Sequence, residues 1–72
     1  MTQTLSGAVA ANIRAELARQ RVSQAQVAER LGLSQAAVSR RLTGQTPFEL
    51  DEVAAVADLL AVAPSHLLAV AA

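Results

Sequence analysis

The 72-residue chain contains no cysteine, tryptophan or tyrosine and only one histidine. Without cysteine it can form neither a disulfide framework nor a thiolate metal site. The single histidine has no second candidate ligand nearby, so it is interpreted as a surface or interface residue. The three glycines form no phosphate-cradling loop, and no catalytic set of side chains is recognisable. We therefore expect no enzyme, no metal and no cofactor.

Long apolar runs are also missing. The uncharged tail over residues 59–72 is interrupted by Pro64 and is shorter than the ~20 apolar residues that a membrane span needs. The N-terminus has no basic region followed by a long apolar stretch, so no signal peptide is visible. We expect one small domain in the cytoplasm of a bacterial or phage-infected bacterial cell, with no membrane partner.

The two signs of charge are equal in number but unevenly distributed. All six arginines lie in residues 1–48 with only two glutamates, whereas residues 49–72 carry four acidic residues and no basic one. This asymmetry indicates a half that faces a polyanion and a half turned away from it. Every basic residue is arginine, which suits bidentate contacts to phosphate or guanine. A GC-rich genome would explain that choice equally well.

Apolar residues recur at helical spacing from Val9 to Leu17, which predicts a first helix ending near Gln20. Residues 1–5 lack this period and are expected to form a flexible arm. The remaining residues, 6–72, are expected to form the domain.

The segment over residues 23–43 has the pattern of two short helices separated by a glycine. Ser23 and Ser34 each precede a helical stretch, where a serine side chain accepts a hydrogen bond from a backbone N–H. Gly32 can adopt the left-handed conformation that a sharp turn between helices needs. These features predict a helix-turn-helix. Its two helices are expected over residues 24–31 and 35–42.

Two more helices are expected after Gly44, which stands where a glycine commonly ends a helix. The first is expected over residues 50–61, with acidic residues in its first turn that favour the positive end of the helix dipole. Pro64 separates a short last helix over residues 65–70. Because no alternation typical of strands occurs, the expected fold class is all-α with five short helices.

Several groups of residues, all in register, carry a resemblance to a known family: Ile13-Arg14, Val22-Ser23-Gln24, Val27-Ala28, Leu31-Gly32-Leu33-Ser34-Gln35, Val38-Ser39-Arg40 and Gly44, then Leu50, Val53, Val56-Ala57, Leu60 and Val62. Over most of its length the chain resembles the lambda-repressor-like, Cro-type helix-turn-helix family. The resemblance implies a compact five-helix domain in which the second helix of the central motif reads DNA.

Two features depart from the family pattern. Many members pair an arginine late in the first helix with a glutamate near the end of the third, whereas this chain has Leu17 and Leu42 there. An apolar contact in place of a buried ion pair is often neutral or stabilising. Arg41 stands where a large apolar residue is usual. We expect its stem to lie on apolar surface with its charged head free, facing solvent or a phosphate.

The resemblance implies that the third helix lies in the major groove. The residues expected to contact bases are Ser34, Gln35, Ala36, Ser39 and Arg40. Gln35 suits adenine, Ala36 a thymine methyl, and Arg40 guanine or a phosphate. The residues expected at the DNA backbone are Gln24, Arg41, Thr43, Gln45 and Arg14. An ordinary surface turn for Thr43 and Gln45 stays open, as does a solvated side chain for Arg14.

The end of the chain holds more apolar residues than a five-helix unit is expected to bury. The residues expected in a dimer interface are Leu59, Val62, Leu67, Leu68 and Val70. A symmetric dimer would place two reading helices about one DNA turn apart on a pseudo-palindromic site. In the alternative interpretation, the last helix folds back and closes the core of the monomer.

The sequence thus predicts a small transcriptional regulator of repressor or Cro type that binds a double-stranded DNA operator and no small-molecule substrate. The alternative is a helix-turn-helix protein-interaction module, such as an antitoxin or anti-repressor. A continuous positive face through Arg14, Arg40 and Arg41 would favour DNA binding. Pairing of the arginines with Glu16 and Glu29 would favour the interaction module.

Overall fold

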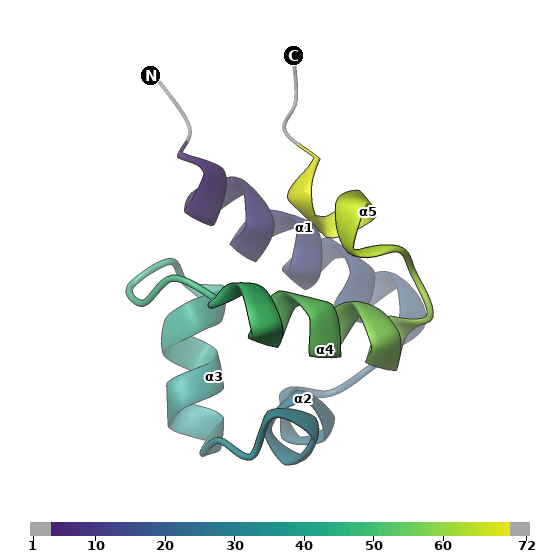
Figure 1. Cartoon of the computed structure of the whole chain (residues 1–72). Helices are drawn as coiled ribbons and strands as arrows, with labels where there is room; N and C mark the ends of the chain where they lie inside the picture. Colours follow the sequence, from purple (N-terminus) through teal and green to yellow (C-terminus); the bar gives the residue numbers. More distant parts are fainter. Residues whose placement is uncertain (1–3, 70–72) are drawn as a thin grey trace.

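Five helices and no strand make up residues 4–69, the part of the chain that the computed structural model describes (Figure 1). They are α1 (Leu5–Gln20), α2 (Gln24–Leu31), α3 (Gln35–Leu42), α4 (Leu50–Leu60) and α5 (Pro64–Leu68). The all-α fold class is therefore confirmed, and both helices of the helix-turn-helix have the predicted bounds. In the described part, no helix has the length and apolar character required to cross a membrane.

Serine side chains cap α2 and α3 as predicted. Oγ of Ser23 accepts a hydrogen bond from the backbone N–H of Gln26 at 3.1 Å, and the Gln26 side chain accepts one from the backbone N–H of Ser23 at 2.8 Å. Oγ of Ser34 accepts from the N–H of Ala37 at 3.1 Å. Each cap contributes about 1 kcal/mol to helix stability. The two starts of the motif are thereby fixed by local hydrogen bonds.

Left-handed residues end three of the helices. Gly32 closes α2 with a φ of 68°, as the sequence predicts. Two residues other than glycine adopt the same conformation: Arg21 after α1, with a φ of 58°, and Ala61 after α4, with a φ of 57°. A side chain in this region costs about 1–2 kcal/mol, because Cβ approaches the following carbonyl oxygen. A strained arginine, Arg21, therefore lies in the turn between α1 and the helix-turn-helix.

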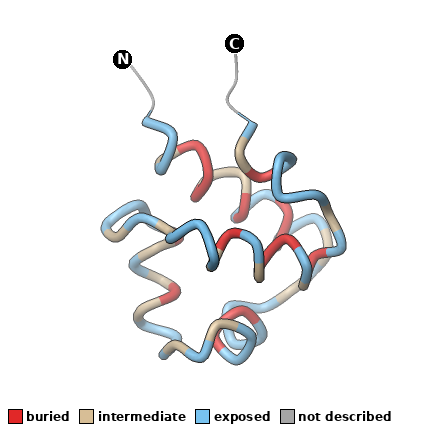
Figure 2. Tube along the Cα trace, viewed as in Figure 1, coloured by how far each residue is buried: buried red, intermediate tan, exposed pale blue. Residues whose placement is uncertain are grey.

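The core lies between α1, α4 and the inner sides of the other helices (Figure 2). Leu17 and Leu42 are both buried and belong to this cluster, as expected for apolar residues in place of an ion pair. Figure 1 shows α2 and α3 at the end of the molecule opposite α5. The helix-turn-helix is thus exposed on one side and supported by the core on the other.

The N-terminal helix begins inside the segment that we expected to be an arm. Leu5 is its first residue, and Oγ1 of Thr4 accepts a hydrogen bond from the N–H of Gly7 at 3.0 Å. The rest of that segment, residues 1–3, lies outside the described residues. So does Val70, one of the residues expected in the dimer interface.

One residue of the expected dimer interface, Leu67, needs correction, because α5 packs back on α1 and α4. Leu67 is 0% exposed and lies in the core. The Nδ2 atom of Asn12 donates to the carbonyl oxygens of Leu67 and Ala69, at 2.9 and 2.7 Å. Three other residues expected there pack partly buried against the core: Leu59, Val62 and Leu68. The alternative, in which the last helix closes the monomer, therefore holds for Leu67.

Candidate nucleic-acid interface

One side of α3 packs inward while the other faces outward. Val38 and Leu42, one turn apart, are buried in the core. Of the other residues of α3, Ala37 and Arg41 are half-buried, and the four that remain are Gln35, Ala36 and Arg40, which are exposed, and Ser39, which is half-buried. We call these four residues the outer face of α3. The structure therefore brings together four of the five residues expected to contact bases.

Ser34, the fifth expected residue, has a structural task. It is exposed, but its Oγ accepts the hydrogen bond that caps α3. Its hydroxyl can still donate one hydrogen bond to, and accept one more from, a partner outside the helix.

A surface hollow of about 390 Å³ opens beside the outer face of α3. Its lining residues come from α1, α2 and α3 and the turns that follow α1 and α3: Arg14, Leu17, Ala18, Arg21, Val22, Gln24, Ser39, Leu42 and Thr43. We call this site the arginine hollow. It gathers three residues expected at the DNA backbone with Ser39 of the outer face. Arg21 was not among the residues expected at the DNA.

Arg14 is held in place within the arginine hollow. Its Nη1 atom donates a hydrogen bond to the carbonyl oxygen of Leu42, in the last turn of α3. Gln24 is the exposed first residue of α2, where helix N–H groups favour an anion. Thr43 and Gln45 are exposed directly after α3, and Oγ1 of Thr43 donates to the carbonyl oxygen of Arg40 at 3.2 Å.

The expectation of a free head on Arg41 is wrong. Its Nε lies 2.9 Å from Oε1 of Glu52 and its Nη2 lies 3.2 Å from Oε2, while Nη1 donates to the Ala37 carbonyl. The Arg41 and Glu52 side chains are only 15% and 14% exposed. A cation so far removed from water requires a carboxylate, and α4 supplies one. Arg41 is therefore not placed to contact a DNA backbone.

The paired charges shift each other's titration. Burial alone would raise the pKa of Glu52, but hydrogen bonds from Arg41 and from the Glu49 backbone outweigh it, and the pKa is lowered. The hydrogen bond to Glu52 raises the pKa of Arg41. Both groups stay charged at neutral pH, so the pair joins α3 to α4 as an ion pair.

The six arginines divide into two groups. Arg19, Arg30 and Arg41 pair with Glu16, Asp58 and Glu52. Within residues 4–69, no carboxylate lies within 4.0 Å of the other three, Arg14, Arg21 and Arg40. Two of these line the arginine hollow and the third lies on the adjacent outer face of α3. The expected positive face through Arg14, Arg40 and Arg41 therefore lacks Arg41. Of the two pairings expected to favour an interaction module, the one with Glu16 occurs, through Arg19, and none with Glu29 occurs within residues 4–69.

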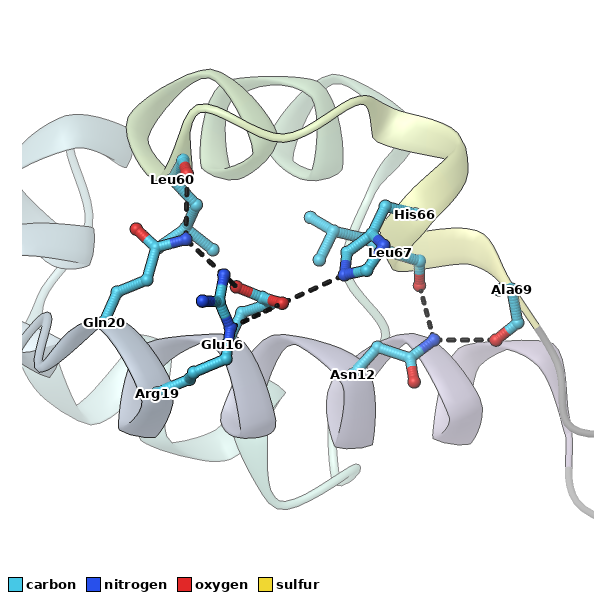
Figure 3. Close-up of polar contacts among 8 residues, drawn as sticks. All are labelled: Asn12, Glu16, Arg19, Gln20, Leu60, His66, Leu67 and Ala69. Atoms are coloured by element: carbon cyan, nitrogen blue, oxygen red, sulfur yellow. Dashed lines mark hydrogen bonds and ion pairs between the residues drawn. The ribbon is translucent and has the colours of Figure 1, made fainter.

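A polar cluster between α1 and α5 was also not predicted from the sequence (Figure 3). Glu16 is 7% exposed and bonds to Arg19 at 2.7 Å, Gln20 at 3.0 Å and Nε2 of His66 at 2.9 Å. The hydrogen bonds from Arg19, His66 and Gln20 lower the pKa of Glu16 to about 2. In the part of the chain that the structure describes, no three histidine or acidic side chains are grouped to hold a metal. The contact between His66 and Glu16 joins α5 to α1.

A family model described as a helix-turn-helix domain matches residues 8–70 of the chain. The matched residues include all of α2, α3, α4 and α5, most of α1 and the whole arginine hollow. Comparisons with curated proteins and with solved structures find no match.

Proposed function

Because the chain belongs to the family of helix-turn-helix domains, we propose that it is a small transcriptional regulator that recognises a specific double-stranded DNA sequence through α3. It would act as a repressor or Cro-type protein does, by occupying an operator and blocking polymerase. No effector is required for such a mechanism.

One observation carries this proposal: the surface formed by the outer face of α3 and the arginine hollow concentrates positive charge. The chain has as many acidic as basic residues, yet no acidic residue lines the hollow. The arginines that have no carboxylate partner among residues 4–69, Arg14, Arg21 and Arg40, all lie on this surface. Phosphates attract such a surface over distances of about 8–10 Å at ordinary salt concentrations.

The outer face of α3 supplies the groups that can distinguish bases. Gln35 can bond bidentately to adenine, and Arg40 can do so to guanine. Ala36 can pack against a thymine methyl group, while Ser34 and Ser39 offer hydroxyls. The residues proposed at the backbone are Gln24, Thr43, Gln45 and Arg14. Phosphate contacts fix the register, and base contacts then select the sequence.

We propose further that two copies bind a pseudo-palindromic operator. A single module of this kind covers ~600–1,000 Å², which is small for tight specific binding, and linking two such contacts raises the affinity steeply. With Leu67 in the core, the exposed apolar residues that favour a second copy are Leu5, 56% exposed, and Leu50, 77% exposed.

Selection of binding sites from random duplex DNA tests the proposal. We expect an enriched sequence with two related half-sites, and we expect the Gln35→Ala variant to lose the preference at one position of each half-site. Glu29→Gln provides a matched control, because Glu29 is exposed on α2 and lines neither the arginine hollow nor the outer face. Failure of the wild-type chain to enrich any sequence would contradict the proposal.

A protein-interaction module, such as an antitoxin or anti-repressor, is the second candidate function. An apolar surface formed by the starts of α1 and α4 and the end of α5 favours it. Its apolar residues, which include Leu5, Phe48, Leu50 and Leu68, line a small hollow of about 130 Å³. An interaction module would bind its partner protein through this surface and would enrich no DNA sequence in the same selection.

A further inference from the structure

We infer that the arginine hollow seats one phosphate of the DNA backbone and that Arg21 is the residue that clamps it. This inference rests on the proposed function, since it assigns a contact of the same DNA-binding surface. It joins three residues already proposed at the backbone, Arg14, Gln24 and Thr43, into one site and adds Arg21, which the sequence pattern does not indicate.

The first step concerns shape. The arginine hollow has a volume of about 390 Å³, which is ample for a phosphate group, since one water molecule needs only ~10–15 Å³ by the same measure. A phosphate group with a few bridging waters fits this space. The apolar members of the lining, such as Leu17 and Leu42, belong to the buried core, so the hollow has a rigid base.

The second step concerns charge. Arg14 and Arg21 both line the hollow, and no acidic side chain does. Arg14 donates one N–H of its guanidinium to the Leu42 carbonyl. This bond fixes the position of the side chain, and the other N–H groups remain available as donors. Guanidinium groups bind phosphate oxygens through two parallel hydrogen bonds. Gln24, Ser39 and Thr43 add uncharged donors around the same space.

The third step concerns the backbone of Arg21. Its φ of 58° and ψ of 41° lie in the left-handed region, where glycine is favoured. Ala61 after α4 has a φ of 57° and a ψ of 38° and lies outside the hollow. The two residues therefore share one source of strain, but only Arg21 brings a charge to the proposed site. This difference makes Ala61 a matched control.

The salt dependence of duplex binding tests the inference. The dissociation constant of the full chain for a selected duplex is measured at several salt concentrations. Arg21→Gln removes the charge and keeps the strain, whereas Arg21→Gly removes both. We expect each variant to lower the slope of log affinity against log salt concentration by about 0.9, the value for one phosphate, and to weaken binding to specific and random duplexes equally.

Two controls separate this contact from general effects. Arg30→Gln changes the net charge by the same amount, but Arg30 pairs with Asp58 and lies outside the hollow. Ala61→Gly relieves the same kind of strain. Neither variant should change the slope. A wild-type slope in Arg21→Gln, or an equal decrease in Arg30→Gln, would overturn the inference and leave the proposed function intact.

Titration with inorganic phosphate supplies a second measurement. We expect the Nε–Hε NMR signals of Arg14 and Arg21 to shift together and to saturate, while the signal of Arg30 stays in place. Shifts with phosphate in a chain that binds no duplex would show a general anion site and overturn the assignment to DNA, together with the proposed function. If no signal shifted in a chain that binds DNA specifically, the assignment of the hollow as a phosphate site would be overturned and the proposed function would stand.

Discussion

The Nε2 atom of His66 on α5 lies 2.9 Å from the Oε1 atom of Glu16 on α1, fifty residues earlier in the chain. Glu16 also bonds to Arg19 and Gln20, and Gln20 donates to the carbonyl oxygen of Leu60 at 2.9 Å (Figure 3). One buried carboxylate therefore connects the long first helix to the end of α4 and to α5. The last helix is fixed by these bonds as well as by the burial of Leu67.

Acid should weaken the fold through this carboxylate. The pKa of Glu16 is lowered from the usual 4.5 to about 2, so its ionised form stabilises the native state above about pH 4.5. That contribution is lost as the pH falls from 4.5 towards 2. Urea unfolding should show a stability difference between wild type and Glu16→Gln that shrinks over this range. A difference independent of pH would contradict the assignment.

Substitutions on the outer face of α3 should change sequence preference. We expect Gln35→Ala and Arg40→Ala each to weaken specific binding by roughly 1–3 kcal/mol and to relax the preference at one base position. Gln24→Ala should weaken specific and random duplexes alike, because its proposed contact is to the backbone. Gel-shift competition with single-base variants of the selected site measures both effects. If Gln35→Ala lost equal affinity for specific and for random DNA, Gln35 would contact only the backbone, and the base contacts would have to be assigned to other residues.

The buried pair Leu17 and Leu42 should tolerate charge only when both residues change. Leu17→Glu or Leu42→Glu alone leaves an unpaired charge in the core and should unfold or severely destabilise the domain. Leu17→Arg combined with Leu42→Glu should recover part of the loss through a new ion pair. Thermal unfolding followed by circular dichroism provides the measurement. A double variant no more stable than the worse single one would mean that the two side chains do not interact.

Replacing the strained alanine should stabilise the protein. Ala61→Gly removes the Cβ from a left-handed residue, and we expect a gain of roughly 0.5–1 kcal/mol after the entropy cost of glycine. Gly32→Ala should have the opposite sign, through backbone strain alone, because a Cβ at Gly32 would meet nothing within 4 Å. Equal melting temperatures for wild type and Ala61→Gly would contradict the expected strain.

The apolar surface around Leu50 should control self-association. Leu50→Ser alters a residue that is 77% exposed, so we expect unchanged helical content, loss of the dimer in sedimentation and operator affinity at least tenfold lower. Leu67→Ser, in contrast, should destabilise the monomer. A wild-type chain that is monomeric in solution and binds one copy per site would rule out the dimer and leave DNA binding in place.

Local signals explain why much of the fold could be predicted from sequence. Ser23, Gly32 and Ser34 determine the ends of α2 and α3 through bonds within a few residues, and an apolar period marks each helix. The pairs Arg41–Glu52 and Glu16–His66 join residues from different helices, whose relative placement no local pattern specifies. For Arg41 the sequence therefore predicts a free head group that faces solvent or a DNA phosphate, because it does not specify that Glu52 of α4 lies beside it.

The division of α3 into an inner and an outer side has a consequence for evolution and engineering. Val38 and Leu42 hold the helix in the core, and Ser34 fixes its start, whereas Gln35, Ala36 and Arg40 contribute little to folding because they are exposed. Under the proposed function, new DNA targets can therefore arise by exchange of these three side chains at almost no cost in stability. A library randomised at those positions alone should yield folded proteins with many different specificities.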